Sequence, residues 1–424
     1  MRKKNILIPL AALMAFIAMA LLLMLTVTAV PRSAIRDNAV ATIDQIDEDA
    51  FHRIPKPIYN VIKPDSFTDC LMCNLVLSVD EDSIVRSAML NPMHLRSIGN
   101  QIADTRQWAH DGRWDYRLTN YGRYWHGYQV PLTALLTVTD YRGIRLVNSI
   151  LYLIFLIVAL TLAWQRCSPA MSIALIVALV LTASPIAAPM SMQYIGCHLI
   201  MLAGVIATLI IPLKSGEKLY VGSTLFIIIG AITAFIDFLT LPVITLGVPV
   251  AFYVERHGSD KRRFRLFMLL CLAWAFGYGV TWASKWLLAG FFTNVDIIGD
   301  AVKTAKYRIS GELPSGKGIK ASAIFAHYAS KITPLRATIS MALLVGTTIM
   351  LRIAAGSWQR LRDNAWLLAV ALLTPAWFCV IVQHSYIHRF FTWRAILVTI
   401  FAITAYIVLT VKKENSSWHH ATAT

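Results

Sequence analysis

The chain has 424 residues, of which 57% are apolar and 15% charged, and its mean hydropathy is +0.59. These values are too hydrophobic for a soluble globular protein and indicate a polytopic membrane protein. The formal net charge of +16 lies largely in short segments that flank apolar runs, as cytoplasmic anchoring predicts. No long basic tract is present, so nucleic-acid binding is not expected.

The N-terminus joins a basic start, Arg2 to Lys4, to an apolar stretch that continues to Val30. This stretch exceeds the roughly 7–15 residues of a signal-peptide core and approaches the ~20 residues that span a bilayer. Residues 1–30 are therefore predicted to form a retained transmembrane anchor.

Ten apolar runs approach or reach the length of a membrane span. They lie near residues 5–30, 144–164, 170–188, 194–213, 220–236, 238–254, 266–290, 336–354, 365–382 and 391–411. Basic residues in alternate short loops place those loops and both termini in the cytoplasm.

Two long segments, residues 31–143 and 291–335, then fall outside the cytoplasm and divide the chain into an anchor, helices 2–7 (144–290), helices 8–10 (336–411) and a tail (412–424). Short helical patterns at 66–79 and 94–108 favour interfacial helices on the membrane surface. The predicted fold class is an all-α polytopic membrane protein with about ten transmembrane helices and a large first extracytoplasmic segment.

Three aspartates of the first outer segment are candidate catalytic residues. Asp65 and Asp69 are four residues apart, which on a helix brings two like charges together at about 0.2–0.5 kcal/mol. A cation or a proton-exchanging substrate would relieve this repulsion, and Asp69 is the preferred base, with Asp37 and Asp65 as further candidates. The structural alternative is a capping box formed by Ser66 and Asp69.

Residues 104–128 are denser in aromatic residues and arginine than a connecting loop requires. Guanidinium groups bind phosphate or pyrophosphate in a bidentate manner, and aromatic faces stack on sugar rings and isoprenoid chains. Arg123, Tyr124, Trp125 and His126 are therefore candidate substrate-binding residues. An interfacial aromatic belt is the alternative.

The segment before the last apolar run places His384 and His388 one helical turn apart, with Arg389 and Arg394 following. Two histidines and two arginines at a membrane surface would suit a lipid-linked phosphate, and simple interfacial anchoring is the alternative. Ser385 stands where the metalloprotease pattern HExxH requires glutamate, so zinc-dependent hydrolysis is not expected.

Asp237 alone interrupts the fifth and sixth runs, where a carboxylate so close to hydrocarbon is costly unless it is paired, so it is a further substrate-binding candidate. Lys285 and Arg352 are expected near helix ends, from which they can snorkel to the interface. Cys70 and Cys73 form a CxxC pair without a second ligand pair nearby, which favours two packing thiols over a zinc site. The metal site stays unknown, and a divalent cation remains open as a cofactor.

Four motifs, PDSFTDCLM, YGRYWHGY, DFLTLPVITLGVP and HSYIHRFFTWR, resemble a group of bacterial multispanning proteins associated with cell-surface polysaccharide synthesis. More distantly, one helix followed by a large outer segment and a helix bundle resembles GT-C-type glycosyltransferases. These resemblances imply a protein of the bacterial cytoplasmic membrane whose partners are a lipid-linked sugar and a glycan acceptor. The acidic residue that serves such enzymes as base or metal ligand is carried over to Asp69, because the usual adjacent acidic pair is absent where Asp37 precedes Asn38.

The expected function is transfer of a sugar from a polyprenyl-phosphate donor to a cell-envelope glycan or glycolipid on the outer face. A carboxylate would deprotonate the acceptor, and arginine and histidine would stabilise the phosphate leaving group. The alternatives are a transporter or flippase of lipid-linked saccharide and a membrane acyltransferase, and the oligomeric state is left open. Catalysis predicts that these residues converge at one outward-facing site.

Overall fold

The structure is a computed structural model that describes residues 4–46, 62–95, 101–111, 117–212, 217–259, 262–313, 315–330, 346 and 358–411. Within these ranges almost all regular structure is helical. Seven helices are long and apolar enough to cross a bilayer, or eight when one bent pair is counted as a span. The chain is therefore a multi-pass, all-α membrane protein, as its composition predicts.

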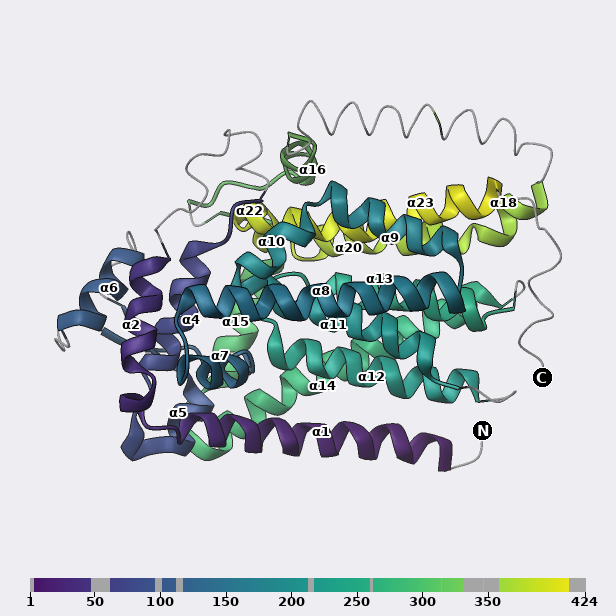
Figure 1. Cartoon of the computed structure of the whole chain (residues 1–424). Coiled ribbons are helices and arrows are strands. Elements are labelled where there is room, and N and C mark those ends of the chain that lie inside the picture. The colour runs from purple at the N-terminus through teal and green to yellow at the C-terminus, as the bar shows by residue number, and fades with distance from the viewer. Residues whose placement is uncertain are drawn as a thin grey trace.

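The spanning helices lie side by side along the long axis of the molecule (Figure 1). Five are continuous: α1 (Lys4–Thr28), α8 (Tyr141–Arg166), α11 (Met192–Ile210), α12 (Lys218–Ile236) and α14 (Arg263–Thr293). Two are assembled from shorter helices: α18 (Trp358–Asn364), α19 (Trp366–Ala371) and α20 (Leu373–Val380) form one, and α22 (Arg389–Thr392), η3 (Trp393–Ile396) and α23 (Leu397–Val411) the other. The beginning of α1 and the end of α23 lie at the same end of the bundle, at the right of Figure 1.

Three predicted runs differ from a simple span. The run at 170–188 is split into α9 (Pro169–Leu181) and α10 (Ser184–Met190), which are bent by 62° with Ala183 in the left-handed region between them. The run at 238–254 becomes α13 (Pro242–His257), whose 16 residues extend about 24 Å and fall short of the ~30 Å hydrocarbon core. The run at 336–354 lies outside the described residues, apart from residue 346.

Helix α13 forms the centre of the bundle. It is buried at every position from Pro242 to Val254, and α11, α12, α14 and α23 pack around it. Beside it, α12 and α14 approach closely through glycine: a Cβ on Gly230 would collide with the carbonyl of Trp274, and one on Gly277 with the carbonyl of Ile227. Small residues allow such close backbone contacts between membrane helices.

Short elements gather at the opposite end of the bundle, at the left of Figure 1. They are η1 (Arg32–Ala34), α2 (Arg36–Gln45), α4 (Ser66–Leu77), η2 (Glu81–Ser83), α5 (Ile84–Leu90), α6 (Gln101–Asp111), α7 (Gln129–Leu136), α15 (Ile297–Ile309), α16 (Ala321–Ser330) and α21 (Val382–Ile387). Strands β1 (Pro92–Leu95) and β2 (Arg117–Asn120) pair antiparallel, with Pro92 opposite Asn120 and Leu95 opposite Arg117.

The two short helices predicted in the first outer segment have different outcomes. The helix predicted at 66–79 is confirmed as α4, but Thr68 to Leu77 are buried along its whole circumference, so it packs as a core helix against α2 and α6. The helix predicted at 94–108 is wrong at its start, because His94 belongs to β1 and α6 begins at Gln101. The pairing of β1 with a strand more than 20 residues away overrides the local helical pattern there.

Candidate functional site

The fully buried carboxylate of Asp69 joins α4 to the beginning of α11. Its two oxygens accept hydrogen bonds from the Tyr141 hydroxyl (2.7 Å), the Ser191 hydroxyl (3.0 Å) and the backbone amides of Met192 (3.2 Å) and Gln193 (3.1 Å). These amides belong to the first turn of α11, where unpaired N–H groups and the helix dipole favour an anion. Asp69 thus supplies the N-terminal cap of another helix.

Burial raises the pKa of Asp69 to about 6. The Tyr141 hydroxyl and the two amides lower it and neighbouring Asp65 raises it, but loss of solvation is the largest effect. At neutral pH the Asp69 carboxyl group is therefore mostly ionised. The four hydrogen bonds that it accepts all come from groups of the protein.

Asp65 has a structural role that replaces the predicted capping box. It is the N-cap of α4 and accepts hydrogen bonds from the Thr68 amide (3.2 Å) and the Thr68 hydroxyl (2.6 Å), whereas the Ser66 hydroxyl donates to the Ile46 carbonyl. The expectation that Ser66 caps this helix is therefore wrong. Burial raises the pKa of Asp65, and its hydrogen bonds with Thr68 and the charge of Arg394 oppose this shift.

Arg394 is buried beside this pair of carboxylates. Its guanidinium lies 4.5 Å from the centre of the Tyr194 ring and donates a hydrogen bond to the Lys63 carbonyl at 3.2 Å. Because Tyr194 follows Gln193 on α11, Arg394, Asp65 and Asp69 form one group around the start of that helix.

Asp237 holds the reversal between α12 and α13. Its carboxylate accepts hydrogen bonds from the amides of Leu239 and Thr240, each at 3.0 Å, and Leu239 adopts a φ of 75°. This local turn explains why α12 ends here although apolar residues continue on both sides. Asp237 is buried and was predicted to need polar partners. The backbone amides of its own turn supply them.

Two histidines connect the turn at Asp237 to α15: His384 lies in α21 and His388 lies at the end of that helix. His384 donates from Nε2 to the Leu239 carbonyl at 2.8 Å, and its ring lies 4.5 Å from that of His388. Arg308, on α15, donates to Nε2 of His388 at 3.1 Å. Burial, reinforced by the charge of Arg308, lowers the pKa of His388 to about 3, so its imidazole is neutral and can accept that bond.

Arg123 lies at the edge of an aromatic cluster. Its guanidinium forms a 3.1 Å ion pair with Asp300 and lies 4.5 Å from the centre of the Tyr121 ring, while the side chain stays 21% exposed. Tyr124 is buried beneath it, 6.4 Å from Phe238 between ring centres. Arg123 is thus a rim residue with access to solvent.

His126 is part of the packed interior of the same cluster. It has a φ of 55°, its Nε2 donates to the Tyr121 carbonyl at 3.0 Å, and its ring lies 5.7 Å from that of Phe238. Burial lowers its pKa to about 3, with smaller contributions from Lys285 and Arg123. A neutral imidazole in this position supports the loop that carries Arg123.

The contacts of Trp125 and Lys285 contradict the expectation that Lys285 snorkels to the interface. The Trp125 indole donates to the Thr281 carbonyl at 2.6 Å, and the Lys285 ammonium lies 5.2 Å from the centre of its ring. Lys285 is fully buried and donates to the Ala88 carbonyl near the end of α5 at 2.8 Å, so it does not snorkel to the interface. Arg352 lies outside the described residues.

The last two predicted residues lie apart from these contacts. Asp37 is exposed in the first turn of α2. Arg389 donates to the Tyr386 carbonyl at 2.9 Å and covers the Tyr386 ring at 4.6 Å. The remaining predicted residues meet in two groups at one end of the bundle, one around the start of α11 and one around the turn at Asp237.

Sequence reasoning missed Arg308 and Asp300, which contribute the charged partners of His388 and Arg123. Both lie on α15, an amphipathic helix of the second outer segment with acidic residues at its start and basic residues at its end. That pattern was present in the sequence, but only the fold shows which earlier residues it faces.

In the part of the chain that the structure describes, no group of three or more His, Cys, Asp or Glu side chains is arranged to hold a metal ion. Cys70 and Cys73 are both buried in α4 and are not joined by a disulfide.

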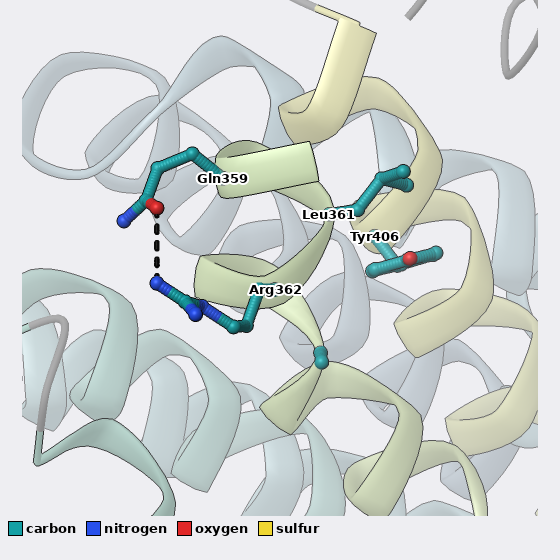
Figure 2. Close-up of a pocket in the computed structure, with 5 residues that line it drawn as sticks. Gln359, Leu361, Arg362 and Tyr406 are labelled. Carbon is teal, nitrogen blue, oxygen red and sulfur yellow. Dashed lines mark hydrogen bonds between the residues drawn. The ribbon is translucent and has the colours of Figure 1, made fainter. Parts of the chain in front are cut away.

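Two cavities lie toward opposite ends of the bundle. One of about 530 Å³ is at the end opposite the predicted site, where Gln359, Leu361, Arg362, Ala365 and Tyr406 line it. Figure 2 shows Arg362 donating to Gln359 there, at 3.0 Å. The other, of about 230 Å³, reaches Gln193 and Asp237 and so contacts both groups of predicted residues.

These features define a multi-pass membrane protein with a layer of charged, histidine and aromatic side chains at one end of its bundle. No protein-family model matches the chain, and no curated protein or solved structure is detectably similar to it. Its site is therefore interpreted from its own chemistry.

Proposed function

We propose that the protein is an integral-membrane glycosyltransferase that moves a sugar from a polyprenyl-phosphate donor to a cell-envelope acceptor. The supporting observation is the meeting of four distant segments at one end of the bundle, around residues 121–128, 237–240, 300–308 and 383–389. Neutral histidines and aromatic rings form its interior and partly exposed arginines its rim. Such a layer suits a ligand with an anionic head and an apolar tail.

The rim arginines would bind the donor phosphate. Arg308 is half-buried with its guanidinium fixed by His388 and by Gln383 (3.4 Å), and Arg123 is held by Asp300. Arginines oriented in this way lose little conformational entropy when they bind a phosphate, and their charge stabilises the leaving group.

Asp300 is the carboxylate best placed to act as the base, because its side chain is 45% exposed beside Arg123. It would accept the proton of the acceptor hydroxyl while the acceptor oxygen bonds to the anomeric carbon. The bond from that carbon to the phosphate oxygen breaks, and polyprenyl phosphate leaves. In this scheme Asp69, Asp65 and Asp237 are positioning residues that fix the starts of α11 and α4 and the turn before α13.

The proposal includes an orientation. The protein would lie in the bacterial cytoplasmic membrane with about ten spans and both termini in the cytoplasm, and its surface-lying helices would form a GT-C-like arrangement. In this orientation the layer of polar side chains would lie on the outer face. The common end of α1 and α23 and the basic residues of the loop between α13 and α14 support it.

A carrier of lipid-linked saccharide is the second candidate, and Lys285 favours it. An ionisable residue buried within a spanning helix often marks a transport pathway. Its contact with the Ala88 carbonyl is the structural explanation that competes with transport.

The test is to incubate purified protein in liposomes with radiolabelled polyprenyl-phosphate sugars and an acceptor glycolipid, measuring transfer and translocation separately. Arg308→Ala should lower kcat/KM for the donor about 10- to 100-fold, the effect of one charge-assisted hydrogen bond. Lys306→Ala, an exposed substitution on the same helix, is the matched control. Translocation without transfer would establish the carrier, and equal losses in both variants would exclude a specific phosphate contact at Arg308.

A further inference from the structure

The cavity of about 230 Å³ lies between α7, α8, α11 and the end of α12 and is lined mainly by apolar side chains. Pro131 and Leu151, on α7 and α8, line it and are exposed, Leu151 by 38%. Helix α8 is the least buried of the spanning helices and carries further exposed apolar residues such as Ile154 and Ile157. The cavity therefore opens sideways, toward the face that meets lipid.

Two polar groups in the lining lack partners. The Tyr128 hydroxyl and the Gln193 side-chain oxygen are buried and have no hydrogen-bond partner among the described residues. Both residues line the cavity, and Tyr128 and Gln193 are only 5% and 6% exposed. Buried polar groups of this kind are normally paired, so these two, which line the cavity, are available to hydrogen-bond a ligand that enters it.

The pattern of these groups selects the chemistry of the ligand. A hydroxyl can accept a hydrogen bond from Tyr128 while donating one to the oxygen of Gln193. A phosphate or carboxylate cannot donate to Gln193 and would also face the carboxylate of Asp237, which lines the same cavity. No lysine, arginine or histidine lines it to offset an anion.

The volume limits how much of the ligand enters. It exceeds the ~150 Å³ of a cavity that holds benzene and is below the ~300–1,000 Å³ of sites that enclose a drug-sized ligand. The polar end and the first part of one chain would fit, with the rest of the chain lying along the exposed apolar surface of α8.

We propose that this cavity is a binding site for a neutral, hydroxyl-headed lipid that enters from the bilayer, with its hydroxyl between Tyr128 and Gln193. The site is separate from the rim arginines. It can be tested by binding alone, so failure of sugar transfer would leave this inference standing.

The experiment uses a photoreactive monoacylglycerol with a diazirine in its chain, added to the purified full-length protein in detergent. Wild-type protein should be labelled on α7, α8 or α11, as mapped by peptide mass spectrometry, and unlabelled monooleoylglycerol should compete. Oleate and lysophosphatidate should compete at least tenfold less well. Labelling elsewhere, or equal competition by the anionic lipids, would overturn the proposal.

Variants test the two features separately. Tyr128→Phe removes only the hydroxyl and should weaken binding about 3- to 10-fold, as expected for one neutral hydrogen bond. Tyr152→Phe is the matched control, because its hydroxyl is also buried without a described partner but does not line the cavity. Leu135→Trp should fill the cavity and abolish labelling while the protein elutes as a single folded species. Unchanged binding in both Tyr128→Phe and Leu135→Trp would refute the site.

Discussion

Replacing Asp69 by alanine tests whether this carboxylate holds the bundle together. The substitution removes the acceptor of four buried donors: two hydroxyls, on Tyr141 and Ser191, and the amides of Met192 and Gln193. Each buried donor left without a partner costs about 1–3 kcal/mol, or roughly 8 kcal/mol for all four. Against this, the variant no longer buries a charge.

The opposing effect can be judged from the pKa of Asp69. Its rise from 3.8 to about 6 corresponds to roughly 3 kcal/mol of destabilisation when the group is ionised. The lost hydrogen bonds outweigh this relief, and the net loss is about 5 kcal/mol in the free energy of unfolding. In detergent the protein is expected to unfold irreversibly, so the measured quantity is an apparent Tm at a fixed heating rate.

We expect the apparent Tm of Asp69→Ala to fall by roughly 5–10 °C, at about 1–2 °C per kcal/mol for a chain of this size. Asp37→Ala, on the exposed face of α2, is the control and should stay within about 1 °C of wild type. A wild-type Tm for Asp69→Ala would refute the capping role. A wild-type Tm for Asp69→Asn combined with loss of sugar transfer would identify Asp69 as the base instead.

Three further predictions follow from the same structure. Because the native pKa of Asp69 is raised, protonation of its carboxyl group adds stability that is fully present below its unfolded pKa and is lost as pH rises through about 6. The difference in apparent Tm between wild type and Asp69→Ala should therefore widen by about 1–2 °C, equivalent to roughly 1 kcal/mol, from pH 7.5 to pH 5. A constant or narrowing difference would contradict the raised pKa. Gly277→Ala should lower the Tm by several degrees, because the added Cβ would collide with the backbone of α12. Gly279→Ala, which has open space around it, should leave the Tm unchanged, and equal effects of the two variants would argue against close α12–α14 packing. In a cysteine-free background, a cysteine at exposed Lys303 should react with an impermeant maleimide from outside intact cells, and one at Arg362 only after permeabilisation; the reverse pattern would invert the proposed orientation.

The sequence alone determined the class of the protein, because the length of an apolar run and the alternation of basic loops are local properties. Nine of the ten predicted runs lie almost wholly within the described residues and coincide approximately with helices there, and α12 ends at the predicted break at Asp237. It could not show that α9 and α10 bend or that α13 is shorter than the hydrocarbon core, since both depend on how the neighbouring helices pack.

Only the tertiary structure decided which groups the polar residues contact. The spacing of Asp65 and Asp69 is compatible with catalysis and with capping. The hydrogen bonds of Asp69 to the start of a helix more than 120 residues away depend on the fold and are not visible in that spacing. The partnership of His388 with Arg308 likewise depends on a contact across 80 residues. Pairings of this kind are fixed by the packing of whole helices, so the sequence indicated which residue types matter, and the fold determined their partners.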